Sequence, residues 1–251
     1  MDKSKNLHGH LFALTANVMW GLMSPIGKSA LQEFSAISVT TFRMVGAAAA
    51  FWLLSIFCKQ EHVDHRDMLK IFFASLFALV FNQGVFIFGL SMTSPIDASI
   101  VTTTLPIVTM VVAAIYLKEP VTNKKVLGIF VGAMGALILI VSSQAGNNGN
   151  GSLIGDLLCL VAQISFSIYL TVFKGLSQRY SAVTINKWMF IYASICYIPF
   201  SYYDISTIQW ASISTVAILQ VLYVVLGGSF LAYLCICLLY TSPSPRDMRR
   251  S

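Results

Sequence analysis

The chain has 251 residues, of which 57% are hydrophobic and only 10% are charged. Soluble globular domains carry about 25% charged residues, so this composition excludes a soluble globule. The formal net charge of +6 is compatible with a nucleic-acid partner, but the basic residues lie in short segments between apolar runs, where membrane orientation accounts for them. We therefore expect an integral membrane protein that binds no nucleic acid.

About eight apolar stretches follow one another along the chain, each close to the length that an α-helix needs to cross a bilayer. They predict membrane spans at residues 11–31, 37–58, 69–90, 98–117, 126–142, 153–173, 185–203 and 216–239. Continuous apolar runs exclude a transmembrane barrel, whose strands alternate polar and apolar residues over about ten positions. The predicted fold class is an all-α integral membrane protein.

Nearly all basic residues fall on one side of the membrane that these spans define. They lie before the first span, at every second loop and in the C-terminal tail, and only Lys28 and Arg43 fall elsewhere. Cytoplasmic loops are enriched in lysine and arginine. We therefore predict a multi-pass protein of a bacterial cytoplasmic (inner) membrane, with its amino terminus in the cytoplasm.

The chain is similar to itself at an offset of about 146 residues, as a search for internal repeats reveals. Gly9 matches Gly155, Leu14 matches Leu160, and further on Ser35-Ala36 matches Ser181-Ala182. The chain makes five predicted spans from the start of the first copy to the start of the second, an odd number, so the second copy enters the membrane from the opposite side. Inverted repeats of this kind are common in secondary transporters. Chance similarity between two apolar helices is the alternative.

Two stretches resemble a known family. The run MWGLMSPIGKSALQEFSAISVTTFRMVGAAAAF carries Trp20, Gly21, Lys28 and Arg43, and this spacing is similar to that of EamA-type transporters in the drug/metabolite transporter superfamily. Residues 91–140 resemble the most diagnostic part of that family, with Pro106 inside a span, Glu119 at its cytoplasmic end and Gly128 opening the next span.

The resemblance implies ten helices in two inverted five-helix repeats, with both termini in the cytoplasm, and the export or exchange of small metabolites. On this basis residues 8–143 are a first, five-helix repeat. Residues 153–240 are a second repeat that is incomplete, with three helices, so about eight spans are present of the ten expected. The Pro- and Ser-rich residues 241–251 are expected to be a non-native or disordered tail.

Arg43 lies six to eight residues inside the second predicted span, roughly 9–12 Å below the outer surface. A cation that faces lipid at such a depth costs about 2.5–3.5 kcal/mol on insertion scales, so Arg43 is expected to face the interior or a wet cavity. It either anchors a carboxylate or phosphate of a substrate, or plays a structural part by snorkelling to the interface or bonding carbonyls at a helix end.

Several other polar or helix-breaking residues lie inside spans, where hydrocarbon offers no hydrogen-bond partners. Bonding between helices is the common use of any single one, but together they are typical of the lining of a polar cavity. The predicted cavity residues are Asn17, Trp20, Arg43, Asn82, Gln83, Pro106, Gln163 and Tyr169.

A second group is expected to be structural. Glu119, in LKEPVTNKK, has lysine neighbours that neutralise it, and Gly128 and Gly132 in GIFVGAMG form a small-residue face for close helix packing. Gly21 and Lys28 complete this group. The cysteines lie in or beside spans, and His62 and His65 lie in a charged loop, so no metal site or cofactor is expected.

The function that these features favour is a secondary transporter, and more narrowly an exporter, that moves small polar metabolites such as amino-acid-like or nucleoside-like compounds by alternating access between inverted repeats. An intramembrane enzyme would need paired acids or histidine-rich metal ligands within the spans, and no histidine or aspartate lies deep in a predicted span. A non-transporting scaffold or an inactive transporter fragment is the alternative. The expected partners are the bilayer and the metabolite, and the sequence leaves a homo-oligomer open.

Overall fold

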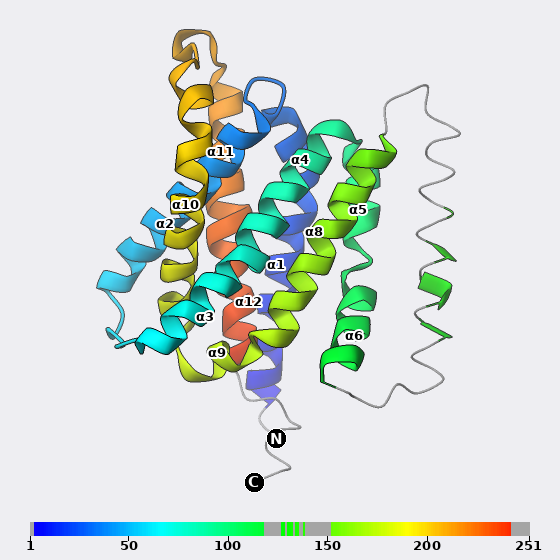
Figure 1. The fold of residues 1–251 in the computed structure, drawn as a ribbon, viewed down its shortest axis with the longest axis vertical. Coiled ribbons are helices and arrows are strands. Elements are labelled where there is room, and N and C mark those ends of the chain that lie inside the picture. The colour runs from blue at the N-terminus through cyan, green and yellow to red at the C-terminus, as the bar shows by residue number, and fades with distance from the viewer. Residues whose placement is uncertain are drawn as a thin grey trace.

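The computed structural model of the chain describes residues 3–117 and 152–241, together with residues 127, 128, 130–132, 134, 135 and 138. The described residues form a bundle of helices that lie side by side along its long axis (Figure 1). The elements of the first part are α1 (Lys3–Ala30), α2 (Ala36–Ile56), α3 (His65–Ser75), η1 (Leu76–Gly84), α4 (Val85–Met92), α5 (Pro95–Thr102) and α6 (Leu105–Tyr116). Those of the second part are α8 (Leu153–Val172), α9 (Lys174–Arg179), α10 (Ala182–Ser206), η2 (Trp210–Ser212), α11 (Thr215–Val225), η3 (Leu226–Leu231) and α12 (Ala232–Thr241).

The helices have the lengths and surfaces of a membrane protein. Within the described ranges, five are long and apolar enough to cross a bilayer, and α1 and α10 reach 28 and 25 residues. Large apolar side chains cover the outside of the bundle; Phe57 is 81% exposed and Phe200 is 75% exposed. Apolar surface on this scale is unfavourable in water and favourable in lipid. The predicted all-α membrane fold class is confirmed.

Most predicted spans correspond to single long helices, with one break that the sequence reading missed. The span predicted at residues 98–117 is divided into α5 and α6 by a turn at Thr103 and Thr104. Pro106 has no N–H to donate to the carbonyl four residues earlier, and its ring disfavours a continuous helix. The span predicted at 126–142 lies largely outside the described residues, and Glu119 and residues 242–251 lie wholly outside them.

The bundle has two ends that we name from Figure 1. The upper end carries the α1–α2 turn and the α10–α11 loop (residues 31–35 and 207–214), and the lower end carries the α2–α3 loop and α9 (residues 57–64 and 174–179). Helix α1 runs from the lower end to the upper end, whereas α8 runs from the upper end to the lower end (Figure 1).

Helices α2 and α10 pack against each other along their length and form the centre of one hydrophobic core cluster. Their N-caps are matched, since the hydroxyl of Ser35 accepts from the N–H of Ser38 and the hydroxyl of Ser181 accepts from the N–H of Thr184. Serine is a preferred N-cap residue because its oxygen satisfies a free N–H of the first turn. Deeper in the bundle, the rings of Phe51 and Phe190 stack with their centroids 5.5 Å apart.

Two long helices contain π-helical turns at related positions. Gln83 lies in η1 and Ser229 lies in η3, and these residues are 146 positions apart, which is the offset of the sequence repeat. A π turn interrupts the regular i→i−4 hydrogen bonding of a helix, and such turns are frequent at functional sites. Both long helices therefore change their hydrogen bonding at the same depth in each half of the chain.

Backbone carbonyls of η1 accept hydrogen bonds from side chains of the second half. The hydroxyl of Tyr233 donates to the carbonyl of Ala78 at 2.7 Å, and the hydroxyl of Tyr197 donates to that of Val80 at 2.9 Å. Because the carbonyls of a π turn must find partners within the protein when the helix lies in lipid, these bonds stabilise the turn and join the two halves.

Helices α4 and α8 approach closely at a pair of glycines. A Cβ atom added to Gly89 would lie 2.7 Å from the carbonyl oxygen of Gly155, and one added to Gly155 would lie 2.8 Å from that of Gly89. Small residues permit this kind of contact between helices in membranes.

This contact predicts the effect of adding a methyl group. We expect Gly89→Ala to destabilise the protein by about 1–3 kcal/mol, because the backbones must separate to admit the side chain. Thermal unfolding of the purified protein in detergent measures the loss. Gly175→Ala is the control, since a Cβ there meets nothing within 4 Å. Equal stability of the two variants would show that the close approach is not needed.

Candidate functional site

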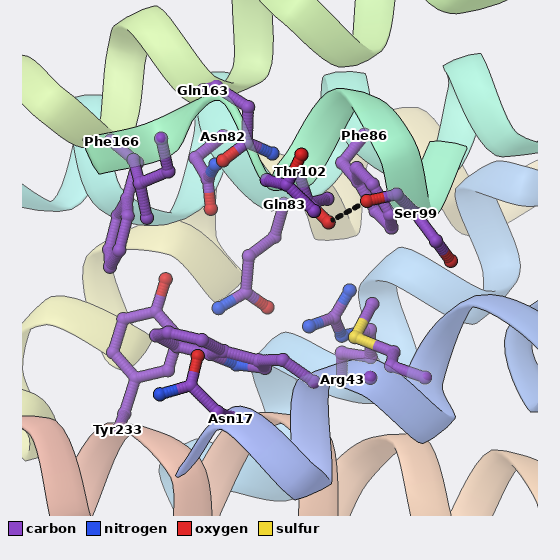
Figure 2. A pocket seen from close by; sticks show the side chains of 15 residues that line it. Asn17, Arg43, Asn82, Gln83, Phe86, Ser99, Thr102, Gln163, Phe166 and Tyr233 are labelled. Carbon is purple, nitrogen blue, oxygen red and sulfur yellow. Dashed lines mark hydrogen bonds between the residues drawn. The ribbon is translucent and has the colours of Figure 1, made fainter. Parts of the chain in front are cut away.

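A cavity of about 390 Å³ lies in the middle of the bundle, between helices of both halves (Figure 2). Cavities of this size hold small organic molecules, and they are commonly apolar with a few well-placed polar groups. Its lining comes from α1, α2, η1, α4, α5, α6, α8 and α12, and the turn between α5 and α6. The lining residues are Asn17, Trp20, Gly21, Met23, Arg43, Asn82, Gln83, Phe86, Ser99, Thr102, Thr103, Leu105, Gln163, Phe166 and Tyr233.

Most of the predicted cavity residues are brought together here. Those that line the cavity are Asn17, Trp20, Arg43, Asn82, Gln83 and Gln163. Two others do not line it. Tyr169 is buried beside it, stacked on Phe166 with ring centroids 5.7 Å apart, and Pro106 follows Leu105 at the start of α6.

Arg43 is the most buried charged group of the cavity wall, with 1% of its surface exposed. Its Nε donates to the hydroxyl of Ser229 at 3.0 Å, and that hydroxyl donates in turn to the carbonyl of Val224 at 3.1 Å. The Nη1 atom is buried and has no hydrogen-bond partner among the residues that the structure describes. The side chain therefore does not snorkel to an interface, and its Nε does not donate to a carbonyl at a helix end. These were two of the alternatives that the sequence left open.

The amides divide into two kinds. The Nδ2 of Asn17 donates to the carbonyl of Ala13, and that of Asn82 donates to the carbonyl of Ala162, each at 2.8 Å. These two amides thus use donors to bond helix backbones. Gln83 differs, because its side chain is buried and its Nε2 has no hydrogen-bond partner in the described part of the chain. Figure 2 shows Gln83 and Arg43 reaching into the cavity from different helices.

One wall of the cavity is aromatic. Trp20 meets Phe166 and Tyr233 edge to face, with ring centroids 5.6 and 6.0 Å apart, and Phe166 and Tyr233 are also 6.0 Å apart. The indole N–H of Trp20 donates to the carbonyl of Gly228 in η3 at 3.1 Å. Edge-to-face aromatic contacts of this kind are favourable beyond simple burial, so the wall is a firm apolar surface.

The opposite side of the cavity is formed where α5 ends and α6 begins. Ser99 and Thr102 line it from α5, and Thr103 lines it from the turn. The hydroxyl of Thr102 donates to the carbonyl of Ser99 at 2.6 Å, so its oxygen remains available as an acceptor (Figure 2). Pro106 acts here indirectly, because it forces the break that exposes these groups.

The residues predicted to be structural play different parts. Lys28 donates from Nζ to the carbonyls of Leu90 and Ser91 at 2.8 and 2.9 Å, which is the favourable place for a cation at the C-terminal end of a helix. Gly21 lines the cavity instead. Gly132 lies against Ile107, whereas a Cβ at Gly128 would meet no atom of the described residues within 4 Å.

The sequence reading missed Ser229 and the aromatic partners Phe166 and Tyr233. For Ser229 a signal was present, because it is the repeat counterpart of Gln83 and their side-chain oxygens lie 3.5 Å apart. The aromatic residues gave no signal, since nothing in an apolar span separates a cavity wall from the core. Among the described residues, no group of three or more His, Cys, Asp or Glu side chains could hold a metal ion.

Comparison with known proteins gives a consistent set of similarities. The sequence profile of the EamA-like transporter family matches residues 7–141 and 153–244. An uncharacterized transporter of Archaeoglobus fulgidus is 27% identical over 190 residues, covering 76% of this chain and 66% of the relative. The uncharacterized transporter YetK of Bacillus subtilis is 20% identical over 233 residues, covering 91% and 70%.

A third relative, the uncharacterized transporter YyaM of Bacillus subtilis, is 27% identical over 169 residues, covering 66% of this chain and 55% of the relative. The chain thus spans 55–70% of the length of these three relatives. A solved structure, titled only as the crystal structure of a protein, superposes with a TM-score of 0.67 at 14% identity. It covers 98% of this chain and 82% of that one, which shows a shared fold.

The cavity makes a prediction about access. A cysteine placed at Thr102, on the cavity wall, is expected to react with a small water-soluble methanethiosulfonate reagent, because a polar cavity admits water. A cysteine placed at Ala74, which is 0% exposed in the core, is expected to stay unmodified. Intact mass, compared with the parent chain that carries the same native cysteines, counts the added labels. Equal labelling at both positions would contradict the cavity.

Proposed function

The chain belongs to the EamA-like transporter family, and we propose from this premise that it is a secondary transporter that exports small polar metabolites. Its mechanism is alternating access, in which one half of the bundle rocks against the other around a fixed central site. The observation that carries the proposal is the cavity itself, which lies mid-bundle, is lined from both halves of the chain and adjoins the interrupted helices at η1 and between α5 and α6.

The packing of the halves supports two inverted repeats. Helix α1 packs on α11 and α12, and its repeat counterpart α8 packs on η1 and α4. Each half therefore places its first helix against the π-interrupted helix of the other half, which is α3–η1–α4 or α11–η3–α12. Together with the opposite directions of α1 and α8 (Figure 1), this exchange is what a two-fold axis between inverted repeats produces. In this proposal the repeats are residues 8–143 and 153–240.

A set of polar contacts joins the halves at the upper end. Glu33 in the α1–α2 turn accepts from the N–H of Ser214 at 2.7 Å and from its hydroxyl at 2.6 Å. Nearby, the hydroxyl of Ser35 donates to Asp204 at 2.7 Å. These contacts hold the start of α2 against the end of α10 and the start of α11.

A corresponding set joins the halves at the lower end. Asp67 in α3 accepts from the hydroxyl of Tyr180 at 2.9 Å and from Arg179 at 3.3 Å. Glu61 accepts from the N–H of Ser181 at 2.9 Å. Both sets lie at the ends of the bundle. Asp67 itself is buried, but Arg179 and Glu33 are exposed, so water can replace the bonds that these two side chains lose at little cost. Opening one end while the other stays closed is therefore energetically accessible, and this is what alternating access requires.

The charges support an orientation. Exposed cations gather at the lower end, among them Lys59, Arg66 and Arg179, and the positive-inside rule assigns such an end to the cytoplasm. In the proposed inner-membrane orientation the amino terminus is cytoplasmic, and the upper end faces outward.

The transport prediction is tested by reconstituting the full chain in liposomes. We expect gradient-driven movement of at least one compound from a panel of labelled amino acids, nucleosides and small organic acids. Liposomes without protein are the control. A protein that folds and inserts but moves none of these compounds would favour the scaffold or inactive fragment instead.

The contact sets predict a shift in conformation. Asp67→Asn removes the charge that holds Tyr180 and Arg179, so we expect the lower end to open more often. Labelling of a cysteine at Thr102 by an impermeant reagent added to the lower side should then quicken by about two- to fivefold. Asp64→Asn is the matched control, because the side chain of Asp64 makes no capping bond. Equal effects of both variants would contradict the role of Asp67.

The upper contacts predict a dependence on pH. The hydrogen bonds from the hydroxyl and then the N–H of Ser214 lower the pKa of Glu33 below its ordinary value of 4.5. The contact is therefore complete above that ordinary value and is lost as the pH falls through the lowered pKa. We expect acid to open the upper end, measured by quicker labelling of Thr102→Cys from the upper side, and Glu33→Gln to remove this dependence. An unchanged acid response in Glu33→Gln would contradict it.

The orientation makes its own prediction. A cysteine at Gln32, exposed at the upper end, is expected to react with an impermeant maleimide added to intact cells. A cysteine at His62, exposed at the lower end, is expected to react only after the membrane is opened. The reverse pattern would overturn the cytoplasmic amino terminus.

A further inference from the structure

The cavity contains a buried positive charge that its own walls do not balance. Arg43 is 1% exposed, and the described residues that line the cavity include no aspartate or glutamate. Within the described residues, Arg43 takes part in neither of the ion pairs, both of which lie at the lower end. A buried charge without a counter-charge is strongly unfavourable, and an anion bound in the cavity would offset that cost.

The hydrogen-bond donors around this charge are arranged to meet such an anion. The bond from Nε to Ser229 fixes the guanidinium, while Nη1 is buried and finds no partner in the described ranges. The Nε2 of Gln83 is a second donor in the same state. Both side chains reach into the cavity (Figure 2). Unsatisfied buried donors are costly, so two on one cavity indicate a ligand that supplies acceptor atoms.

The rest of the cavity indicates which chemical group would form the other end of that ligand. Trp20, Phe166 and Tyr233 form an apolar aromatic wall, which suits a ring or a branched hydrocarbon body. A cationic group would find no carboxylate on the lining and would be repelled by Arg43. The cavity is thus complementary to a molecule with one negative end and one apolar end.

We infer that the cavity binds small organic carboxylates whose carboxyl group pairs with Arg43 and Gln83 and whose apolar body lies against the aromatic wall. This inference rests on the proposed function and names the substrate class of its site. A guanidinium matches the planar geometry of a carboxylate, and a single cation balances a single negative charge. Zwitterions and cations are disfavoured by the same charge balance.

The test uses probes of one shape and different charge. The full chain, purified in detergent, is titrated with phenylacetate, 2-phenylacetamide, phenethylamine and benzylphosphonate, while tryptophan fluorescence and thermal unfolding report binding. Phenylacetate is expected to bind at least about tenfold more tightly than the neutral amide or the amine, because only it pairs with the buried donors. Benzylphosphonate, with its larger charge, is expected to bind more weakly than phenylacetate.

Variants assign the preference to its residues. Arg43→Gln is expected to bring the affinity for phenylacetate down to that for the amide, and Arg66→Gln, at an exposed lower-end position, is expected to leave it unchanged. If Arg43→Gln fails to fold, Gln83→Met keeps the test open, since it retains size and removes one donor. It is expected to weaken phenylacetate binding by about three- to tenfold.

Several results would overturn the inference. They are equal affinity for the acid, the amide and the amine, no binding of phenylacetate at millimolar concentration, tighter binding of the phosphonate, or a preference that survives both variants. Transport in liposomes separates this outcome from the proposed function. Binding of phenylacetate without movement would support the carboxylate site and count against transport. Movement of phenethylamine in preference to phenylacetate would support transport and contradict the carboxylate site.

Discussion

Inside a bilayer, a polar group must find its partner within the protein, and this constraint organises the centre of the molecule. The π turns of η1 and η3 leave backbone carbonyls available that, in a regular helix, would accept hydrogen bonds from backbone N–H groups. Tyr233, Tyr197 and Trp20 donate to carbonyls in these turns. Each bond runs between the two halves. The bonds that satisfy the carbonyls of the π turns therefore also hold the halves together around the cavity.

The same bonds explain why the cavity lies where it does. A helix that is regular throughout presents only side chains to its neighbours, and the neighbouring helices can pack directly against it. The turns of η1 and η3 and the break between α5 and α6 carry or adjoin lining residues such as Gln83 and Thr103. Irregular backbone at membrane depth is tolerated where it is buried in protein or lines a cavity, and both conditions are met here.

Composition and the length of the apolar stretches were enough to predict the helical membrane fold and most of its spans, because hydrocarbon thickness sets helix length. The need for polar groups to be satisfied also led to the prediction that Asn82 and Gln83 line a cavity, and both lie on the lining of this one. The division of α5 from α6 was missed because Pro106 can kink a helix or break it, and the sequence does not say which. Phe166 could not be found, since a cavity wall and a packed core use the same aromatic residues. Ser229 could have been found by extending the repeat past Trp188.

The position of Arg43 follows from a short sequence through a chain of local causes. The run Gly227-Gly228-Ser229 forms part of a π turn, and within it the hydroxyl of Ser229 gives its proton to the carbonyl of Val224, five residues earlier. Its oxygen can then only accept, and it accepts from Nε of Arg43. That bond uses the inner nitrogen of the guanidinium and leaves an outer one, Nη1, unpartnered. A lysine at this position would present one ammonium with no such division, so the π turn and the arginine together determine which atoms the cavity offers.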